Sequence, residues 1–144
     1  MTKKFFSVLV VFGVLFSVPF APSAYAHKDF GPASWQTEDG KWELTITTDS
    51  VDNDVDINTW DIYRVNIATG QSTRYHGQYL SARLCNASTG NCTAYKNLDD
   101  PLVHDVWGAT FTNMKPGTYH VDIRDSESGY YYKGMIRASV HDSY

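Results

Sequence analysis

Alternation of apolar and polar residues with a period of two is the feature that most constrains the fold of this chain. The pattern recurs in seven runs, 42–47, 63–67, 80–84, 92–96, 107–111, 119–123 and 132–140. Successive side chains of a strand point to opposite faces, so such runs predict strands. In the first run the pattern places Trp42, Leu44 and Ile46 on one shared face. Apolar residues do not recur with the spacing of a helix over a stretch long enough to predict one.

Turn-forming residue pairs separate these runs and complete the fold prediction. They are Asp39-Gly40, Thr69-Gly70, Thr89-Gly90, Pro116-Gly117 and Ser128-Gly129. Seven short strands without a helix predict one all-β domain, an antiparallel β-sandwich of about seven strands. The stretch 27–36 has no such pattern and is expected to be an irregular arm.

The segment 111–123 has a strand pattern, a Pro-Gly turn and Tyr119 at the start of the next run. This arrangement resembles the tyrosine corner of immunoglobulin-like sandwiches. The resemblance implies an immunoglobulin-like fold in which the Tyr119 hydroxyl bonds to backbone upstream of the turn. It carries little information about function.

Residues 1–26 have the organisation of a secretory signal peptide. Lys3 and Lys4 precede an uncharged apolar run, and Ala24-Tyr25-Ala26 is a cleavage motif. Cleavage after Ala26 would leave residues 27–144 as one secreted domain that begins with His27. No later segment approaches the length of a membrane span. The short dibasic leader is typical of bacteria.

The charge of this domain limits its partners. The 144-residue precursor has a net charge of −4, and its leader holds Lys3 and Lys4, so the remaining 118 residues carry −6. An acidic surface repels phosphates, which argues against nucleic acid or an anionic membrane as the main partner.

The two cysteines, Cys85 and Cys92, are expected to form a disulfide after export. The intervening residues 86–91 are typical of a turn, so the bond should close a hairpin.

Short motifs resemble two families of secreted sandwiches. Asp54-Val55-Asp56, the stretch 84–90 and the stretch 116–121 together resemble pre-peptidase C-terminal domains, which are non-catalytic and in some cases bind calcium and extracellular polymers. The His27 terminus and the stretch 116–124 are similar to CopC-type copper carriers. That second family supplies an Asp and a His from the loop that follows, whereas residues 125–130 here contain no His.

Two groups of residues predict alternative metal sites. Asp52, Asp54 and Asp56 have the opening spacing of a calcium loop, although the Gly and Glu of an EF-hand are missing. His27 could bind copper through its free amino group and its imidazole. A second imidazole would come from His76, His104, His120 or His141, and His104 has the neighbouring carboxylate of Asp105. His120 is expected to face solvent, because Tyr119 and Val121 should point inward.

The motifs of common enzymes, such as GxSxG, HExxH or a Gly-rich phosphate loop, are not present in the sequence. We therefore expect a non-catalytic protein. The densest aromatic run, Tyr130, Tyr131 and Tyr132, followed by Lys133, is the candidate binding surface for an extracellular protein or polysaccharide. Calcium would be a structural cofactor in this interpretation, and an extracellular copper-binding protein is the alternative. A third interpretation is a secreted inhibitor or toxin that presents the disulfide-closed turn 86–91.

Overall fold

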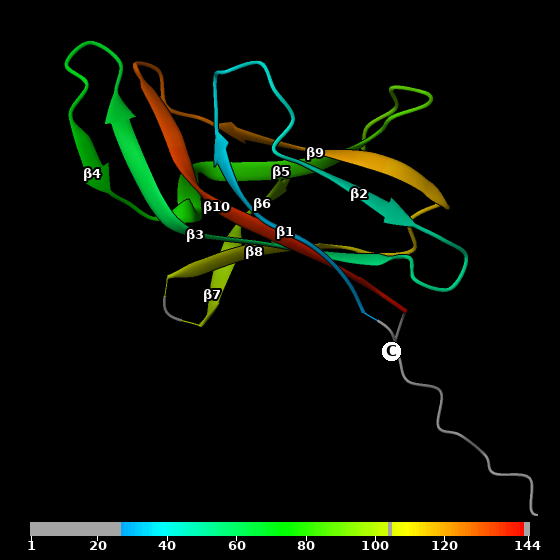
Figure 1. The fold of residues 1–144 in the computed structure, drawn as a ribbon. Helices are drawn as coiled ribbons and strands as arrows, with labels where there is room; N and C mark the ends of the chain where they lie inside the picture. Colours follow the sequence, from blue (N-terminus) through cyan, green and yellow to red (C-terminus); the bar gives the residue numbers. More distant parts are fainter. Residues whose placement is uncertain (1–26, 104, 143–144) are drawn as a thin grey trace, which may run out of the picture.

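The computed structural model describes residues 27–103 and 105–142, so the predicted signal peptide lies outside the described residues. Ten strands of this part form two antiparallel sheets that pack face to face (Figure 1). The chain is therefore an all-β sandwich, as the alternation predicts.

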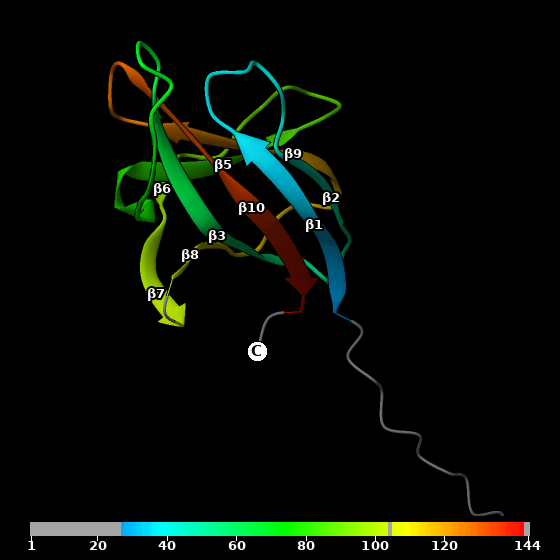
Figure 2. The same cartoon turned by 60° about the vertical axis from the view of Figure 1, so that its left-hand side comes forward.

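Sheet A has six strands. They are β1 (Lys28–Gln36), β3 (Asp54–Asn66), β4 (Ser72–Arg74), β7 (Asp99–Val103), β8 (Val106–Phe111) and β10 (Tyr130–His141). The strand order is β1-β10-β3-β8-β7. The long strand β3 pairs with β8 through residues 55–59 and with β4 through residues 63–65. Figure 2 shows β1, β10 and β3 lying side by side.

Sheet B has four strands in the order β2-β9-β5-β6. They are β2 (Leu44–Thr48), β5 (Leu80–Asn86), β6 (Lys96–Asn97) and β9 (Gly117–Asp125), and the single-turn 3₁₀ helix η1 (Gly77–Tyr79) leads into β5. One face of each sheet supplies the core between them. Fully buried core side chains include Val55, Ile57, Ile136 and Val140 of sheet A and Ile46, Leu84 and Val121 of sheet B.

The tyrosine corner is present. Tyr119 is 6% exposed, and its hydroxyl donates a hydrogen bond of 2.9 Å to the carbonyl of Lys115. This bond ties the start of β9 to the turn that precedes it.

The expected disulfide joins Cys85 to Cys92. Residues 86–91 form the turn of a hairpin, in which the Asn86 N–H donates to the Asn91 carbonyl at 2.8 Å. The side-chain oxygen of Asn86 accepts bonds from the backbone N–H groups of Ser88 and Thr89, both at 3.0 Å. A disulfide is consistent with a non-reducing environment. Within the described ranges, no helix has the length and apolar character of a membrane span.

The prediction of an irregular arm at residues 27–36 is wrong. Lys28–Gln36 is strand β1, which pairs with β10, and Trp35 is 4% exposed in the core. The register shifts between Phe30 and Ala33, around Gly31 and Pro32, and this shift breaks the alternation that would have indicated a strand. The run 92–96 is also shorter than predicted, because only Lys96 and Asn97 form a strand there.

Candidate binding face

The outer surface of sheet B gathers aromatic, charged and hydrogen-bonding side chains. On β9, Tyr119, Val121 and Ile123 are buried, so His120, Asp122 and Arg124 point outward, as expected for His120. Side chains from β5, from the chain just before β2 and from the chain just before β6 lie beside them. We call this surface the sheet-B face, and its residues are Trp42, Glu43, Arg83, Tyr95, His120, Asp122 and Arg124.

Trp42 is the largest exposed group of the sheet-B face. Its side chain is 51% exposed and stacks on His120, with ring centroids 5.2 Å apart and an angle of 9° between the planes. The Nδ1 atom of His120 lies 3.0 Å from the Thr45 hydroxyl, which holds the imidazole in place. One side of the indole is therefore supported by the protein.

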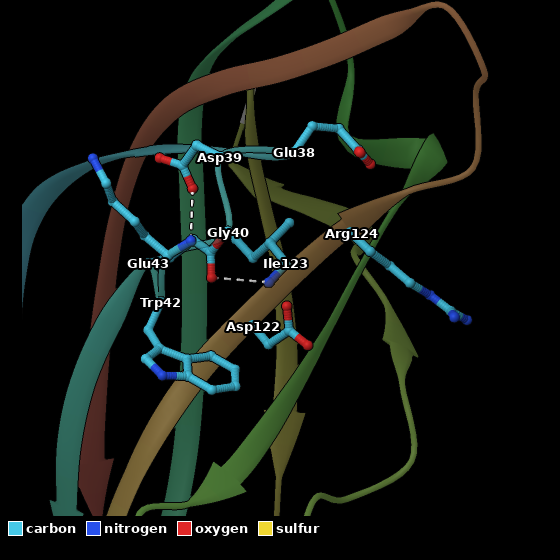
Figure 3. Close-up of a pocket in the computed structure, with 9 residues that line it drawn as sticks. Glu38, Asp39, Gly40, Trp42, Glu43, Asp122, Ile123 and Arg124 are labelled. Atoms are coloured by element: carbon cyan, nitrogen blue, oxygen red, sulfur yellow. Dashed lines mark hydrogen bonds between the residues drawn. The ribbon is translucent and has the colours of Figure 1, made fainter.

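The prediction that Trp42 shares a face with Leu44 and Ile46 is wrong, and Glu43 supplies the reason. Strand β2 begins at Leu44, although the Glu43 N–H still donates to the Val121 carbonyl at 3.1 Å. The Glu43 carboxyl accepts the N–H of Ile123 at 3.1 Å. If the strand continued before Glu43, a backbone carbonyl would accept this N–H instead. The chain leaves the sheet at this point, and Trp42 moves to the outside (Figure 3).

Burial raises the pKa of the Glu43 carboxyl to about 8, and the negative charges of Asp122 and Asp39 act in the same direction. The hydrogen bond from Ile123 lowers the pKa and offsets part of this effect. Glu43 is therefore mostly protonated at neutral pH, and the sheet-B face is less negative than its sequence suggests.

Asp122 and Tyr95 form the polar centre of the sheet-B face. The Nε atom of Arg83 donates to Asp122 at 2.6 Å, and the Tyr95 hydroxyl donates to the same oxygen at 2.8 Å. The guanidinium groups of Arg83 and Arg124 lie over the Tyr95 ring at 4.5 and 3.6 Å from its centroid. These contacts hold the charged side chains in fixed positions before any ligand arrives.

A pocket of about 460 Å³ lies beside Trp42. The turn 38–43 forms one wall, and Asp122, Ile123 and Arg124 of β9 form the other (Figure 3). The arrangement offers a planar apolar ring next to several hydrogen-bond donors and acceptors, which is the composition of a site for a ligand with both apolar and polar surfaces.

The predicted tyrosine surface is largely absent. Tyr132 is fully buried and its hydroxyl bonds to Glu127, while Tyr130 packs over the guanidinium of Arg64, 4.4 Å from its carbon. Alternation along β10 sends these two rings inward, toward the core. Only Tyr131, which is half-buried, and Lys133, which is exposed, remain on the outer side of sheet A.

The three aspartates of the predicted calcium loop do not form a loop, because Asp54 and Asp56 belong to β3. Each carboxylate has a protein partner: Asp52 pairs with Lys28 at 3.0 Å, Asp54 accepts the Asn113 N–H at 2.8 Å, and Asp56 accepts the Thr110 hydroxyl at 2.6 Å. Over residues 27–103 and 105–142, no group of three or more His, Cys, Asp or Glu side chains is placed to hold a metal ion. Calcium binding stays a prediction.

Of the residues considered for copper, His104 lies outside the described residues, and His120 belongs to the sheet-B face. His27 is exposed, and its ring centroid lies 5.5 Å from that of His141. The Nε2 atom of His141 lies 3.0 Å from a carboxylate oxygen of Asp56, and its Nδ1 lies 2.8 Å from the Asp142 carbonyl. A metal would have to compete with these bonds.

Comparison with known proteins identifies no match: no family model, no curated protein and no solved structure is similar to this chain at a significant level. The two family resemblances therefore depend on their short motifs alone, and the sheet-B face has to be interpreted from its own chemistry. Sequence reasoning did not select Trp42, Glu43, Arg83, Tyr95, Asp122 or Arg124 as site residues. The alternation of 119–123 was the one signal available, since it places Asp122 on the same side as His120.

Proposed function

We propose that this protein is a secreted, non-catalytic binding protein that holds an extracellular polysaccharide on the sheet-B face. The observation that carries the proposal is the half-exposed indole of Trp42, fixed on His120 beside a pocket with hydrogen-bonding walls. This surface replaces the tyrosine run as the binding surface.

The chemistry of a sugar ring supports this assignment. Each ring has an apolar face of C–H groups and a rim of hydroxyls, so it can lie on an indole while its hydroxyls bond to neighbouring side chains. Asp122, Glu43 and Arg124 can accept or donate such bonds close to Trp42. A role in binding rather than catalysis agrees with the environment of Asp122, because its carboxylate is already bonded to Arg83 and Tyr95.

An extracellular location is part of the proposal. The leader with its Ala24-Tyr25-Ala26 motif supports export, and the disulfide between Cys85 and Cys92 is consistent with an oxidising compartment.

Affinity electrophoresis through gels that contain single polysaccharides, both neutral and acidic, tests the proposal. We expect at least one polysaccharide to retard the wild-type protein, and we expect Trp42→Ala to abolish the retardation. Tyr63→Ala is the matched control, because Tyr63 is an exposed aromatic residue of β3 that lies outside the sheet-B face. Equal retardation of wild type and Trp42→Ala, or none in any gel, would contradict the proposal.

A copper-binding protein is the second candidate, and the proximity of His27 to His141 favours it. Copper should then raise the melting temperature of a chain that begins at His27. Addition of one residue before His27 should remove this rise, because it blocks the amino group. The same experiment with calcium in place of copper tests the aspartate prediction. A copper-induced rise that survives the added residue would exclude a terminal site.

A further inference from the structure

A second pocket, of about 500 Å³, lies next to the first on the same side of the molecule. Its walls include Tyr79 of η1, Ser81 of β5, Asn97 of β6 and Asp125 at the end of β9. Arg124 lines both pockets. Figure 3 shows the Arg124 side chain extending away from Trp42, with Asp122 between them.

Arg124 differs from the other arginines of the described chain because no carboxylate pairs with it. The other four pair with acids: Arg64 with Glu127 at 3.3 Å, Arg74 with Asp105 at 3.2 Å, Arg83 with Asp122 at 2.6 Å and Arg137 with Asp29 at 2.7 Å. The guanidinium carbon of Arg124 instead lies over the Tyr95 ring, 3.6 Å from its centroid. Its fork of N–H donors is thus positioned between two pockets without an acidic partner.

We propose that the two pockets are neighbouring subsites of one groove for a polysaccharide chain that contains a uronic acid, whose carboxylate pairs with Arg124. This inference rests on the proposed function. The planar fork of an arginine matches a carboxylate with two parallel hydrogen bonds, and its position on an aromatic ring reduces the freedom lost on binding.

The acids next to Arg124 on β9, Asp122 and Asp125, have partners within the protein, whereas Glu38 and Asp39 on the opposite wall of the first pocket are exposed. Arg83 neutralises Asp122, and the two oxygens of Asp125 accept the Thr37 hydroxyl at 2.6 Å and the Glu127 N–H at 3.1 Å. The raised pKa of Glu43 removes most of a further negative charge at neutral pH. The overall charge of −6 still opposes a densely charged polymer, which favours a chain with one carboxylate per repeat rather than one on every sugar.

Tyr79 gives the groove a second aromatic contact at its far end. Its side chain is 38% exposed and stacks on Tyr75 with ring centroids 5.8 Å apart. A ligand that reaches from Trp42 past Arg124 to Tyr79 would be a chain of several sugars, so affinity should increase with chain length.

The test is an array of acidic oligosaccharides, each paired with the same compound after reduction of its carboxyl groups to alcohols. Isothermal titration of the best binder then compares two, four and six sugars. We expect the compound of six sugars to bind at least tenfold more tightly than the compound of two sugars. Reduction of the carboxyl groups should weaken binding at least tenfold. Arg124→Gln should weaken binding of the acidic compound by a similar factor and remove most of the difference in affinity between the acidic and the reduced compound.

Lys133→Gln is the control for charge, because Lys133 is an exposed cation on sheet A, and it should bind like wild type. Tyr79→Ala should remove most of the increase in affinity that comes with a longer oligosaccharide. Equal binding of acidic and reduced compounds, with Trp42 still required, would overturn this inference and leave the proposed function intact. Binding that Trp42→Ala leaves unchanged would overturn both. No binding to any member of the array would overturn this inference, and retardation by a neutral polysaccharide would still support the proposed function.

Discussion

At the residue scale, Glu43 connects the fold to the candidate site. Its carboxyl accepts the Ile123 N–H just before the start of β2, and this bond lets the chain turn Trp42 outward without leaving that N–H unpaired. The same position buries the carboxyl, which raises its pKa to about 8. One side chain therefore both exposes the indole and lowers the negative charge of the face.

Glu43 should make stability depend on pH. The pKa of Glu43 in the folded protein, about 8, exceeds its ordinary value of 4.5, so the folded state binds the proton more tightly. The stabilisation is complete below pH 4.5 and is lost as pH rises toward 8. Glu43→Gln keeps a neutral side chain of the same shape. Its melting temperature, relative to wild type, should rise steadily between pH 5 and pH 8.5.

Calorimetry across this pH range measures the effect. His141, whose pKa is raised by its bonds to Asp142 and Asp56, titrates equally in both proteins and cancels in the comparison. Glu38→Gln, a change at an exposed carboxylate of the same turn, should follow wild type at every pH. Parallel curves for wild type and Glu43→Gln would refute the assignment.

Tyr119→Phe tests the tyrosine corner. The substitution removes the bond to the Lys115 carbonyl, which keeps the Thr48 hydroxyl as a partner at 2.8 Å. Loss of one such bond should lower the free energy of unfolding by about 1 kcal/mol in urea denaturation. Tyr63→Phe, at an exposed ring, is the control and should be neutral. A neutral Tyr119→Phe would show that the corner contributes nothing to stability.

At the element scale, the strands with regular alternation could be predicted and the irregular ones could not. Residues 107–111 and 119–123 alternate strictly, and they lie within β8 and β9. Strand β1 was missed because its register shifts at Gly31 and Pro32. The first half of β3 was interpreted as an acidic loop because Asp52, Asp54 and Asp56 have the opening spacing of a calcium loop, and only pairing with β10 and β8 shows that Asp54 and Asp56 belong to a strand.

The disulfide between Cys85 and Cys92 should stabilise the hairpin that ends β5. Cys85 is buried and Cys92 is exposed, so Cys85→Ala with Cys92→Ser removes the bond without burying a hydroxyl. Eight residues from Cys85 to Cys92 close the loop, and the loss of this constraint on the unfolded chain should cost about 2.5 kcal/mol. Urea denaturation of the two proteins measures this difference. An unchanged midpoint would mean that the hairpin is stable without the bond.

Gly77 in η1 packs against Trp107 of β8 so closely that no side chain fits. A Cβ atom at this position would lie 2.5 Å from the Cγ atom of Trp107. Gly77→Ala should therefore displace η1 or the indole and lower the free energy of unfolding by roughly 1–3 kcal/mol. Thermal denaturation checks this, with the exposed Ser72→Ala as control. A wild-type melting temperature for Gly77→Ala would contradict the packing.

At the scale of the whole molecule, the candidate site exists only because the sheet assembles. Its residues come from positions 42, 43, 83, 95, 120, 122 and 124, and antiparallel pairing of β2, β9 and β5 brings them together. Alternation within β9 could predict that His120, Asp122 and Arg124 lie on the same side of the strand. No local pattern could predict that Trp42 leaves its strand, because the cause is a bond between Glu43 and Ile123, residues 80 positions apart.

The proposal also requires that the domain is exported and processed. Mass spectrometry of the protein from the culture medium of its expression host should give a chain that begins at His27. Substitution of Ala24 and Ala26 by larger residues should leave an uncleaved precursor. An unprocessed chain retained inside the cell would contradict secretion.

Whether the sheet-B face binds the polysaccharide is tested most directly by a map of the ligand contact from amide chemical shifts. A ¹H–¹⁵N spectrum of the domain would be recorded during titration with the polysaccharide that retards it. If the ligand binds the sheet-B face, amide shifts should change at Trp42, at Asp122 and Arg124, and at the residues around Tyr95, and those on the outer side of sheet A should stay unchanged. Shifts confined to Tyr131 and Lys133, or to the turn 86–91, would contradict the assignment of the sheet-B face.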